Sequence, residues 1–133
     1  MSSHAESLEI RRSEDVVQVR QRVRAFAAEA GLRLVDETKI ITAASELARN
    51  VVTYANSGTA RIELVSDGRR QGVRVTFEDN GPGIADLELA MKDGYTTGAG
   101  LGLGLGGARR LSNEFEIQSK PGEGTRVTIT RWR

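Results

Sequence analysis

A carboxylate and a carboxamide stand four residues apart in the middle of the chain, at Glu46 and Asn50. Within a helix this spacing places both side chains on one face, one turn apart. A carboxylate can take a proton from a hydroxyl, and an amide oxygen can bind a hard cation such as Mg²⁺. Taken alone, the pair is equally consistent with an ordinary solvated helix edge, so its meaning depends on the rest of the chain.

A second group, Asp79-Asn80-Gly81-Pro82-Gly83, follows an apolar segment at 72–77. Asn-Gly and Gly-Pro are common turn formers, so a surface turn is the simpler interpretation. Two glycines around a proline, however, are more than a hairpin needs. A carboxylate at Asp79 can accept a hydrogen bond from the exocyclic amine of adenine and would repel the O6 acceptor of guanine. The group is therefore consistent with an adenine contact.

The third group is a glycine stretch with interleaved leucines, from Gly98 to Gly107. Backbone N–H groups in such a stretch can converge on phosphate oxygens, and the helix that follows offers its positive end. No Gly-Lys-Ser/Thr follows, which argues against a Walker loop. Gly102, Gly104 and Gly107 do match G-x-G-x-x-G, but the strand that a dinucleotide fold requires is missing before them. A flexible linker would leave the leucines exposed. We favour a phosphate-binding loop.

A fourth group, Gly122-Glu123-Gly124-Thr125, falls between two predicted strands. As a hairpin turn it implies nothing by itself. The hydroxyl of Thr125 could reach a water molecule or the edge of an adenine.

Hydrophobic periodicity predicts the elements that must position these four groups. Apolar residues at three- and four-residue spacing indicate helices at about 13–30 and 35–54, after a short strand around Leu8 and Ile10. Alternation of apolar and polar residues then indicates strands at 60–64, 72–77, 115–119 and 126–130, with a short helix near 86–92 and another carrying Ala108 and Leu111. This order predicts an α/β (α+β) two-layer sandwich, in which helices cover one face of a mixed, mainly antiparallel sheet.

Composition narrows the class of protein. A chain of 133 residues suits one domain, 1–133, with residues 1–6 expected to form a disordered tail. Nineteen basic against 18 acidic residues give a net charge of +1, which argues against nucleic-acid binding. The chain has no cysteine, so disulfides, thiolate metal sites and a cysteine nucleophile are excluded. We see no signal peptide and no apolar run of membrane-spanning length, and expect a soluble cytoplasmic domain.

In order and spacing, the four groups resemble the motifs of the Bergerat-fold (GHKL, histidine kinase-like) ATPase superfamily, which includes histidine kinases, gyrase, Hsp90 and the MutL proteins. Glu46-Leu47-Ala48-Arg49-Asn50 is similar to its N-box. Asp79-Asn80-Gly81-Pro82-Gly83 is similar to the first glycine box, Gly100-Leu101-Gly102-Leu103-Gly104 to the second and Gly122-Glu123-Gly124-Thr125 to the third. The resemblance covers nearly the whole chain from Val16 onwards.

The resemblance implies a role for each group, with ATP and Mg²⁺ as cofactors. Asn50 would bind Mg²⁺ through its amide oxygen, and Glu46 would act as general base on the attacking hydroxyl. Asp79 would bind adenine, directly and through a water that Thr125 shares. The remaining implied contacts come from glycines and leucines: Gly81 and Gly83 would let the backbone pass the base, and Gly100, Leu101, Gly102, Leu103 and Gly104 would form the lid over the phosphates.

Chain length and the flanks of the glycine stretch favour one branch of the superfamily. We expect no room for the second domain that supplies a lysine in gyrase and Hsp90, and the one histidine, His4, falls in the expected tail. The branches that remain as candidates are the small stand-alone kinases and the anti-sigma factors of bacterial partner switching. Segments 87–97 and 106–117 resemble the switch serine kinases of the stress pathway.

Such kinases are implied to phosphorylate a serine or threonine on STAS-domain stressosome proteins and, when released, to activate a serine phosphatase. Two alternatives stay open. One is an anti-sigma factor kinase that sequesters a sigma subunit, and the other is an ATP-sensing binding module with little catalysis.

Overall fold

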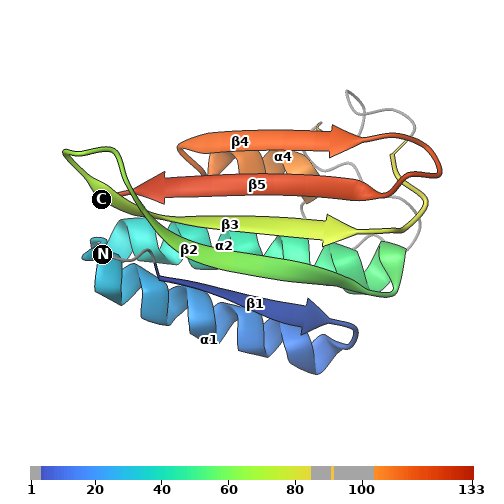
Figure 1. The fold of residues 1–133 in the computed structure, drawn as a ribbon, viewed down its shortest axis with the longest axis horizontal. Coiled ribbons are helices and arrows are strands. Elements are labelled where there is room, and N and C mark those ends of the chain that lie inside the picture. The colour runs from blue at the N-terminus through green and yellow to red at the C-terminus, as the bar shows by residue number, and fades with distance from the viewer. Residues whose placement is uncertain (1–3, 85–90, 92–103) are drawn as a thin grey trace.

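A five-stranded sheet covered on one face by helices is the framework of the molecule (Figure 1). The computed structural model describes residues 4–84, 91 and 104–133. The strands are β1 (Ala5–Ile10), β2 (Gly58–Ser66), β3 (Gln71–Asp79), β4 (Glu114–Ser119) and β5 (Thr125–Trp132). The helices are α1 (Ser13–Ala30), α2 (Leu34–Asn50) and α4 (Gly104–Arg110), with a π-helical turn at Val51–Ala55 directly after α2. The predicted two-layer sandwich is confirmed.

The strands lie in the order β1-β2-β3-β5-β4, and all four pairings among them are antiparallel. A mixed sheet was expected, so this detail of the prediction needs correction. Strand β4 does run in the same direction as β3, but β5 lies between them and pairs with both. The chain passes from α4 into the outer strand β4 and then folds back as β5 into the place between β3 and β4, so none of the described strands has a parallel neighbour.

The core lies between the sheet and the two long helices. Every residue of the two predicted helical stripes is buried: Val16, Val19, Val23, Phe26, Ala27 and Ala30 on α1, and Ile40, Ala44, Leu47, Ala48 and Val51 on α2 and the turn that follows. Alternate strand residues such as Val75, Phe77 and Ile129 meet them from the sheet. Because successive strand side chains point to opposite faces, the other set of strand residues forms an open, largely polar face.

The expected disordered tail is wrong for residues 4–6, which belong to the fold. The imidazole of His4 stacks on the ring of Phe26 with 4.6 Å between centroids, and the carbonyl of His4 accepts a hydrogen bond from the N–H of Leu64 at 3.0 Å. Glu6 forms an ion pair with Arg22 on α1. Pairing with β2 and packing on α1 therefore order the chain from His4 onwards.

A buried ion pair joins the start of α2 to the end of β5. Asp36 is 2% exposed, and its Oδ1 accepts hydrogen bonds from Nε and Nη2 of Arg131 at 2.9 and 2.7 Å, while its Oδ2 accepts one from Arg33. Burial alone would raise the pKa of the Asp36 carboxyl, but the hydrogen bonds and charges of the two arginines outweigh burial and hold the pKa below its usual value. Arg131 also reaches the carbonyl of Leu111, just after α4.

Two predicted features fall largely outside the described residues: the short helix near 86–92, of which the structure describes Met91 alone, and the glycine stretch from Gly98 to Gly107, of which it describes only the part from Gly104 onwards. Within the part of the chain that is described, no helix has the length and apolar character needed to cross a membrane.

Candidate functional site

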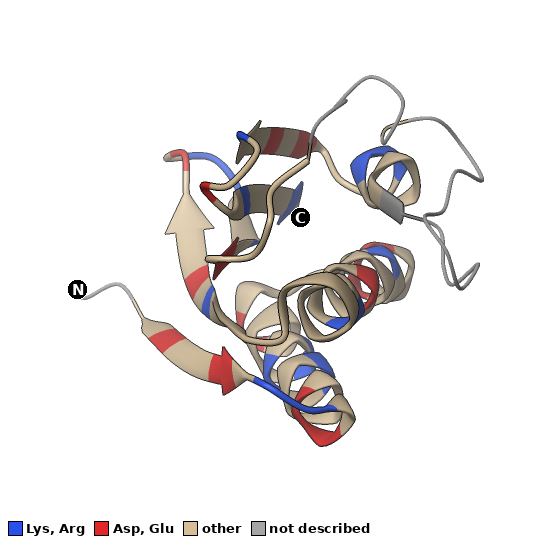
Figure 2. Cartoon of the chain, turned by 90° about the vertical axis from the view of Figure 1, so that its right-hand side faces the viewer, with Lys and Arg blue, Asp and Glu red and all other residues tan. Residues whose placement is uncertain are grey.

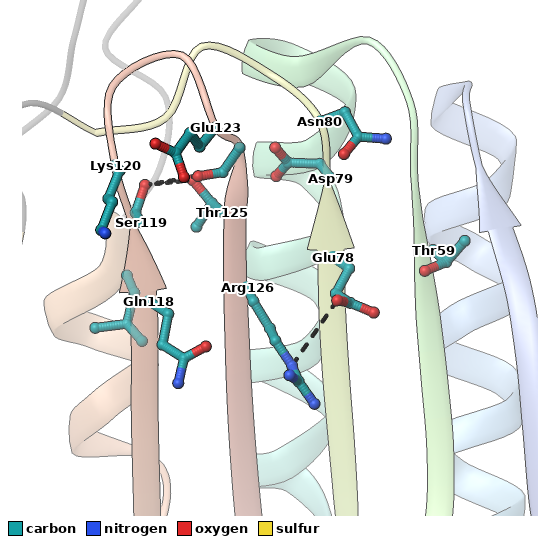
Figure 3. Close-up of a pocket in the computed structure, with 12 residues that line it drawn as sticks. Thr59, Glu78, Asp79, Asn80, Gln118, Ser119, Lys120, Glu123, Thr125 and Arg126 are labelled. Atoms are coloured by element: carbon teal, nitrogen blue, oxygen red, sulfur yellow. Dashed lines mark hydrogen bonds and ion pairs between the residues drawn. The ribbon is translucent and has the colours of Figure 1, made fainter.

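The first and third glycine boxes come together at one end of the sheet (Figure 3). Asp79 at the end of β3 pairs in register with Thr125 at the start of β5, and Thr125 pairs on its other side with Ser119 of β4. Two residues earlier on β3, Phe77 is buried against the helices. Because strand side chains alternate, Asp79, Thr125 and Ser119 all belong to the helix-covered side of the sheet.

The carboxylate of Asp79 is oriented by its own loop. Its Oδ1 accepts a hydrogen bond from the N–H of Gly81 at 2.9 Å, the geometry of an Asx turn. Among the described residues, Oδ2 has no hydrogen-bond partner and remains available as an acceptor. The structure thus gives the predicted adenine-binding carboxylate a defined direction and one unoccupied oxygen.

The two loops are interlocked through glycine. A Cβ on Gly124, whose φ is +81°, would lie 2.1 Å from the carbonyl oxygen of Asp79, and a Cβ on Gly83 would lie 2.0 Å from that of Lys120. The N–H of Gly122 donates to the carbonyl of Pro82 at 2.7 Å. Only glycine allows backbones to approach this closely. Packing between the two loops is therefore sufficient to require glycine at position 83. The sequence analysis expected Gly83 to let the backbone pass close to the adenine base, and this role stays a prediction.

The end of α2 is held against the same loop by the π-helical turn. A continuous helix to Tyr54 was predicted, but α2 ends at Asn50, and the wider turn Val51–Ala55 follows. A Cβ built on Gly58 would lie 2.9 Å from Cγ1 of Val51, and one on Gly81 would lie 2.7 Å from Cβ of Ala55. Single π turns within helices are often found at functional sites. This turn brings the helix end that carries Asn50 next to the loop that begins with Asp79.

Glu46 lies one turn before Asn50, and its side chain is 15% exposed. Its Oε2 pairs with Nη1 of Arg49 at 3.2 Å, while Oε1 has no hydrogen-bond partner in the described structure. The carboxamide of Asn50 likewise has none among these residues. One carboxylate oxygen and one carboxamide are thus free to engage groups that come from outside this part of the chain.

The second glycine box enters the described structure only at its last residue, Gly104. Gly100, Leu101, Gly102 and Leu103 lie outside the described residues, and Gly104 begins α4. Helix α4 packs against α2 and buries Leu105 and Ala108. The chain therefore re-enters the described structure beside α2, the helix that carries Asn50, and the position of the glycine stretch next to the site stays a prediction.

A surface hollow at this end of the sheet extends onto the open face (Figure 3). Glu78 and Arg126 lie opposite each other there, with 3.9 Å between Oε2 and Nε. The hollow includes Asp79 and Thr125 but not Glu46 or Asn50, which lie on α2 behind the sheet. Its lining residues are Thr59, Glu78, Asp79, Asn80, Ile117, Gln118, Ser119, Lys120, Glu123, Gly124, Thr125 and Arg126.

Charges of both signs are spread over the helices and the strands (Figure 2). The described residues contain no cluster of three or more histidine, aspartate or glutamate side chains that could hold a metal ion by themselves. A cation at Asn50 would need further ligands from outside the described residues, such as phosphate oxygens and water.

Sequence reasoning missed Ser119. Its Oγ accepts a hydrogen bond from the N–H of Ile84 at 2.9 Å, donates to the carbonyl of Gly124 at 3.0 Å and lies 2.8 Å from Oγ1 of Thr125. The predicted hairpin could have identified it. If strands 115–119 and 126–130 pair around the predicted turn, Ser119 lies beside Thr125, as the register shows.

Comparison with known proteins agrees with this geometry. Residues 35–132 match the family model of the histidine kinase-, DNA gyrase B- and HSP90-like ATPases. The chain is 46% identical to the serine/threonine-protein kinase RsbT of Bacillus subtilis over 118 residues, which cover 89% of each chain. It is 33% identical to the anti-sigma F factor of Thermoanaerobacter sp. over 83% of this chain and 80% of that protein.

A solved structure shows the same fold. The crystal structure of the RsbU and RsbW domains of Rv1364c from Mycobacterium tuberculosis superposes with a TM-score of 0.63 at 24% identity, over 96% of this chain and 33% of that longer one. The matched family is one of ATPases, and in the described residues Asp79 of the first glycine box pairs with Thr125 of the third, close to the turn that follows the helix carrying Asn50. The chain therefore belongs to the family of histidine kinase-, DNA gyrase B- and HSP90-like ATPases, and within that family it is a homologue of RsbT.

Proposed function

We propose that this protein is an ATP-dependent serine/threonine protein kinase of a bacterial partner-switching stress pathway, acting in the cytoplasm. The observation that carries the proposal is the 46% identity to the kinase RsbT over 89% of both chains. The geometry of Asp79, Thr125 and Asn50 supports the nucleotide-binding part of it.

Adenine binding is assigned to Asp79 with Thr125. The Oδ2 of Asp79 is an acceptor without a partner among the described residues, and the hydrogen bond from Gly81 to Oδ1 holds the carboxylate in place. An exocyclic amine supplies the donor that such an oxygen requires, whereas a carbonyl at the same position would be repelled. The glycine box from Gly100 to Gly104 would close over the phosphates.

Magnesium binding is assigned to Asn50. Its carboxamide has no partner in the described structure, and amide oxygen is among the ligands that Mg²⁺ accepts. Because no acidic cluster surrounds it in the described residues, the remaining ligands would be phosphate oxygens and water. When bound, the ion would neutralise charge on the phosphates during transfer.

Proton transfer is assigned to Glu46. Arg49 holds one of its carboxylate oxygens and leaves the other free. Since Glu46 and Asn50 project from one face of α2, a hydroxyl placed beside the phosphates could reach the free oxygen. Glu46 would then take the hydroxyl proton as the oxygen attacks the γ-phosphoryl group.

The protein substrates would be STAS-domain stressosome proteins, and the second partner a serine phosphatase. One surface could serve both, because a phosphate at the first interface adds nearly two negative charges and weakens that complex. Release from the phosphorylated partner would then free the kinase to bind the phosphatase.

A single-turnover transfer assay tests the proposal. The full chain is mixed with radiolabelled ATP, magnesium and a candidate STAS-domain protein from the source organism, and phosphoserine or phosphothreonine is measured on that protein. Label on the STAS protein is expected. If the chain binds ATP but transfers no phosphate to that partner, it acts as an ATP-sensing module instead.

The 33% identity to anti-sigma F factors favours one second candidate, a kinase that sequesters a sigma subunit. Pull-down from cells of the source organism separates the two. Recovery of a sigma subunit in place of STAS proteins would support this candidate over the first.

A further inference from the structure

The hydroxyl of Ser119 is surrounded by three polar groups from two parts of the site, the end of the first glycine box and the third glycine box. These are the N–H of Ile84, which follows the first glycine box, the carbonyl of Gly124 in the third, and the hydroxyl of Thr125. Ser119 lies on β4, directly opposite Thr125 in the antiparallel register. Neither the motifs nor the proposed function uses this residue.

Counting hydrogens fixes the direction of each bond. A serine hydroxyl has one hydrogen and two lone pairs. The Ile84 N–H can only donate, so it occupies one lone pair, and the Gly124 carbonyl can only accept, so it takes the hydrogen. The remaining lone pair of Ser119 faces Oγ1 of Thr125 at 2.8 Å. Thr125 must therefore donate its hydrogen to Ser119.

This direction decides what Thr125 can offer a ligand. With its hydrogen committed to Ser119, Oγ1 of Thr125 presents only lone pairs. Asp79, its register partner on the other side, also presents only acceptors when ionised. The corner between them is thus an all-acceptor environment, which suits an amine and disfavours a carbonyl.

We propose that Ser119 is a positioning residue that holds Thr125 as a hydrogen-bond acceptor and so sharpens the preference of the site for a purine with an exocyclic amine at position 6. The inference rests on the proposed function, since it assumes that the base lies at Asp79 and Thr125. Without the Ser119 hydroxyl, Thr125 could turn its hydrogen toward the ligand and donate to a carbonyl.

The test compares the affinities of ATP and ITP, which differ at position 6 by an amine against a carbonyl. Titration calorimetry on the full chain with magnesium gives the ratio of the two dissociation constants. Wild type is expected to prefer ATP, and Ser119→Ala is expected to lower that preference about tenfold, the scale of one redirected hydrogen bond. Ser119→Thr, which keeps the hydroxyl and suits a strand, is expected to retain it.

Two further variants separate positioning from simple loss of structure. Thr125→Val should lower the ATP preference as much as Ser119→Ala, and the double variant should lower it no further, because Ser119 acts through Thr125. Thr128→Val is the control: it removes a hydroxyl from the same strand, where Thr128 contacts Thr76 at 3.4 Å on the open face, and should leave the ratio unchanged. Circular dichroism confirms that each variant is folded before titration.

Each failure has a separate meaning. If Ser119→Ala weakens ATP and ITP by the same factor, or if the double variant shows the sum of two effects, Ser119 is merely structural and the inference is wrong. Should Ser119→Ala not fold, an unchanged ratio in Thr125→Val would overturn the inference in the same way. Wild type that binds neither nucleotide would instead refute the proposed nucleotide site.

Discussion

Replacing Gly124 by alanine tests whether the interlocked glycine loops hold the site together. Gly124 and Gly122 belong to the same turn and have nearly the same left-handed backbone, with φ of +81° and +79°. A Cβ on Gly124 would lie 2.1 Å from the carbonyl oxygen and 3.1 Å from the carbonyl carbon of Asp79, whereas a Cβ on Gly122 meets nothing within 4 Å. The two substitutions therefore share the backbone penalty and differ in the clash.

The expected magnitudes follow from these contacts. A left-handed alanine costs about 1–2 kcal/mol, partly offset by about 0.4–1 kcal/mol because alanine restricts the unfolded chain. Gly122→Ala should therefore lower the free energy of unfolding by at most about 1.6 kcal/mol. At Gly124 the obstructing atoms are backbone and cannot rotate away, so overpacking adds about 1–3 kcal/mol. We expect Gly124→Ala to cost about 1–5 kcal/mol, which is about 1–3 kcal/mol more than Gly122→Ala.

Urea denaturation followed by circular dichroism measures both free energies, and titration with ATP measures the site. Because the backbone that must yield is that of Asp79, Gly124→Ala should also weaken ATP binding by about tenfold or more, while Gly122→Ala should bind as wild type does. If the two variants lose the same stability and the same affinity, the close approach of Gly124 to Asp79 is not what determines glycine there, and the packing argument fails.

Three other substitutions probe the buried ion pair, the adenine contact and the proposed base. Asp36→Ala leaves the Arg131 guanidinium buried without its partner and should cost about 3–5 kcal/mol at pH 7 by urea denaturation. Folding lowers the pKa of Asp36, so its contribution to the free energy of unfolding is complete above about pH 4, the pKa in the unfolded chain, and is lost as the pH falls through the pKa in the folded chain. The free energies of unfolding of wild type and variant should therefore converge in acid. A constant difference between them down to the acid transition would contradict this. Asp79→Asn should weaken ATP binding about tenfold or more by calorimetry, because the amide oxygen stays on the N–H of Gly81 and the second acceptor is replaced by an NH2 donor, with the melting temperature nearly unchanged; unaltered affinity would refute the adenine role. Glu46→Gln should slow single-turnover transfer about 10²–10⁴-fold with ATP affinity retained, whereas Arg49→Ala, which only removes its exposed partner, should transfer nearly as fast as wild type; a Gln variant as fast as wild type would exclude Glu46 as the base.

Local patterns in the chain were sufficient to predict much of this protein. The buried stripes of α1 and α2 follow from helical spacing alone, because a helix side chain's face depends only on its position along the turn. The same holds for the strands, whose alternation decides which residues meet the helices. Motif order predicted the family, and the structure confirms that Asp79 and Thr125 lie side by side.

The partners of individual side chains required the tertiary structure, since they depend on strand register and on contacts between distant segments. Asp36 and Arg131 are 95 residues apart, so no local sequence pattern predicts that they form an ion pair. Ordering of His4 depends on Phe26 and β2, and the all-antiparallel sheet depends on β5 taking the place between β3 and β4. From the sequence, Ser119 is one polar residue at the end of a strand. Only the register of the hairpin shows that it lies opposite Thr125. The sequence alone thus determined the elements, the family and the chemical groups of the site, whereas only the folded chain decided their directions: which oxygen of Asp79 is free, where α2 widens, and toward which neighbour the Thr125 hydroxyl points.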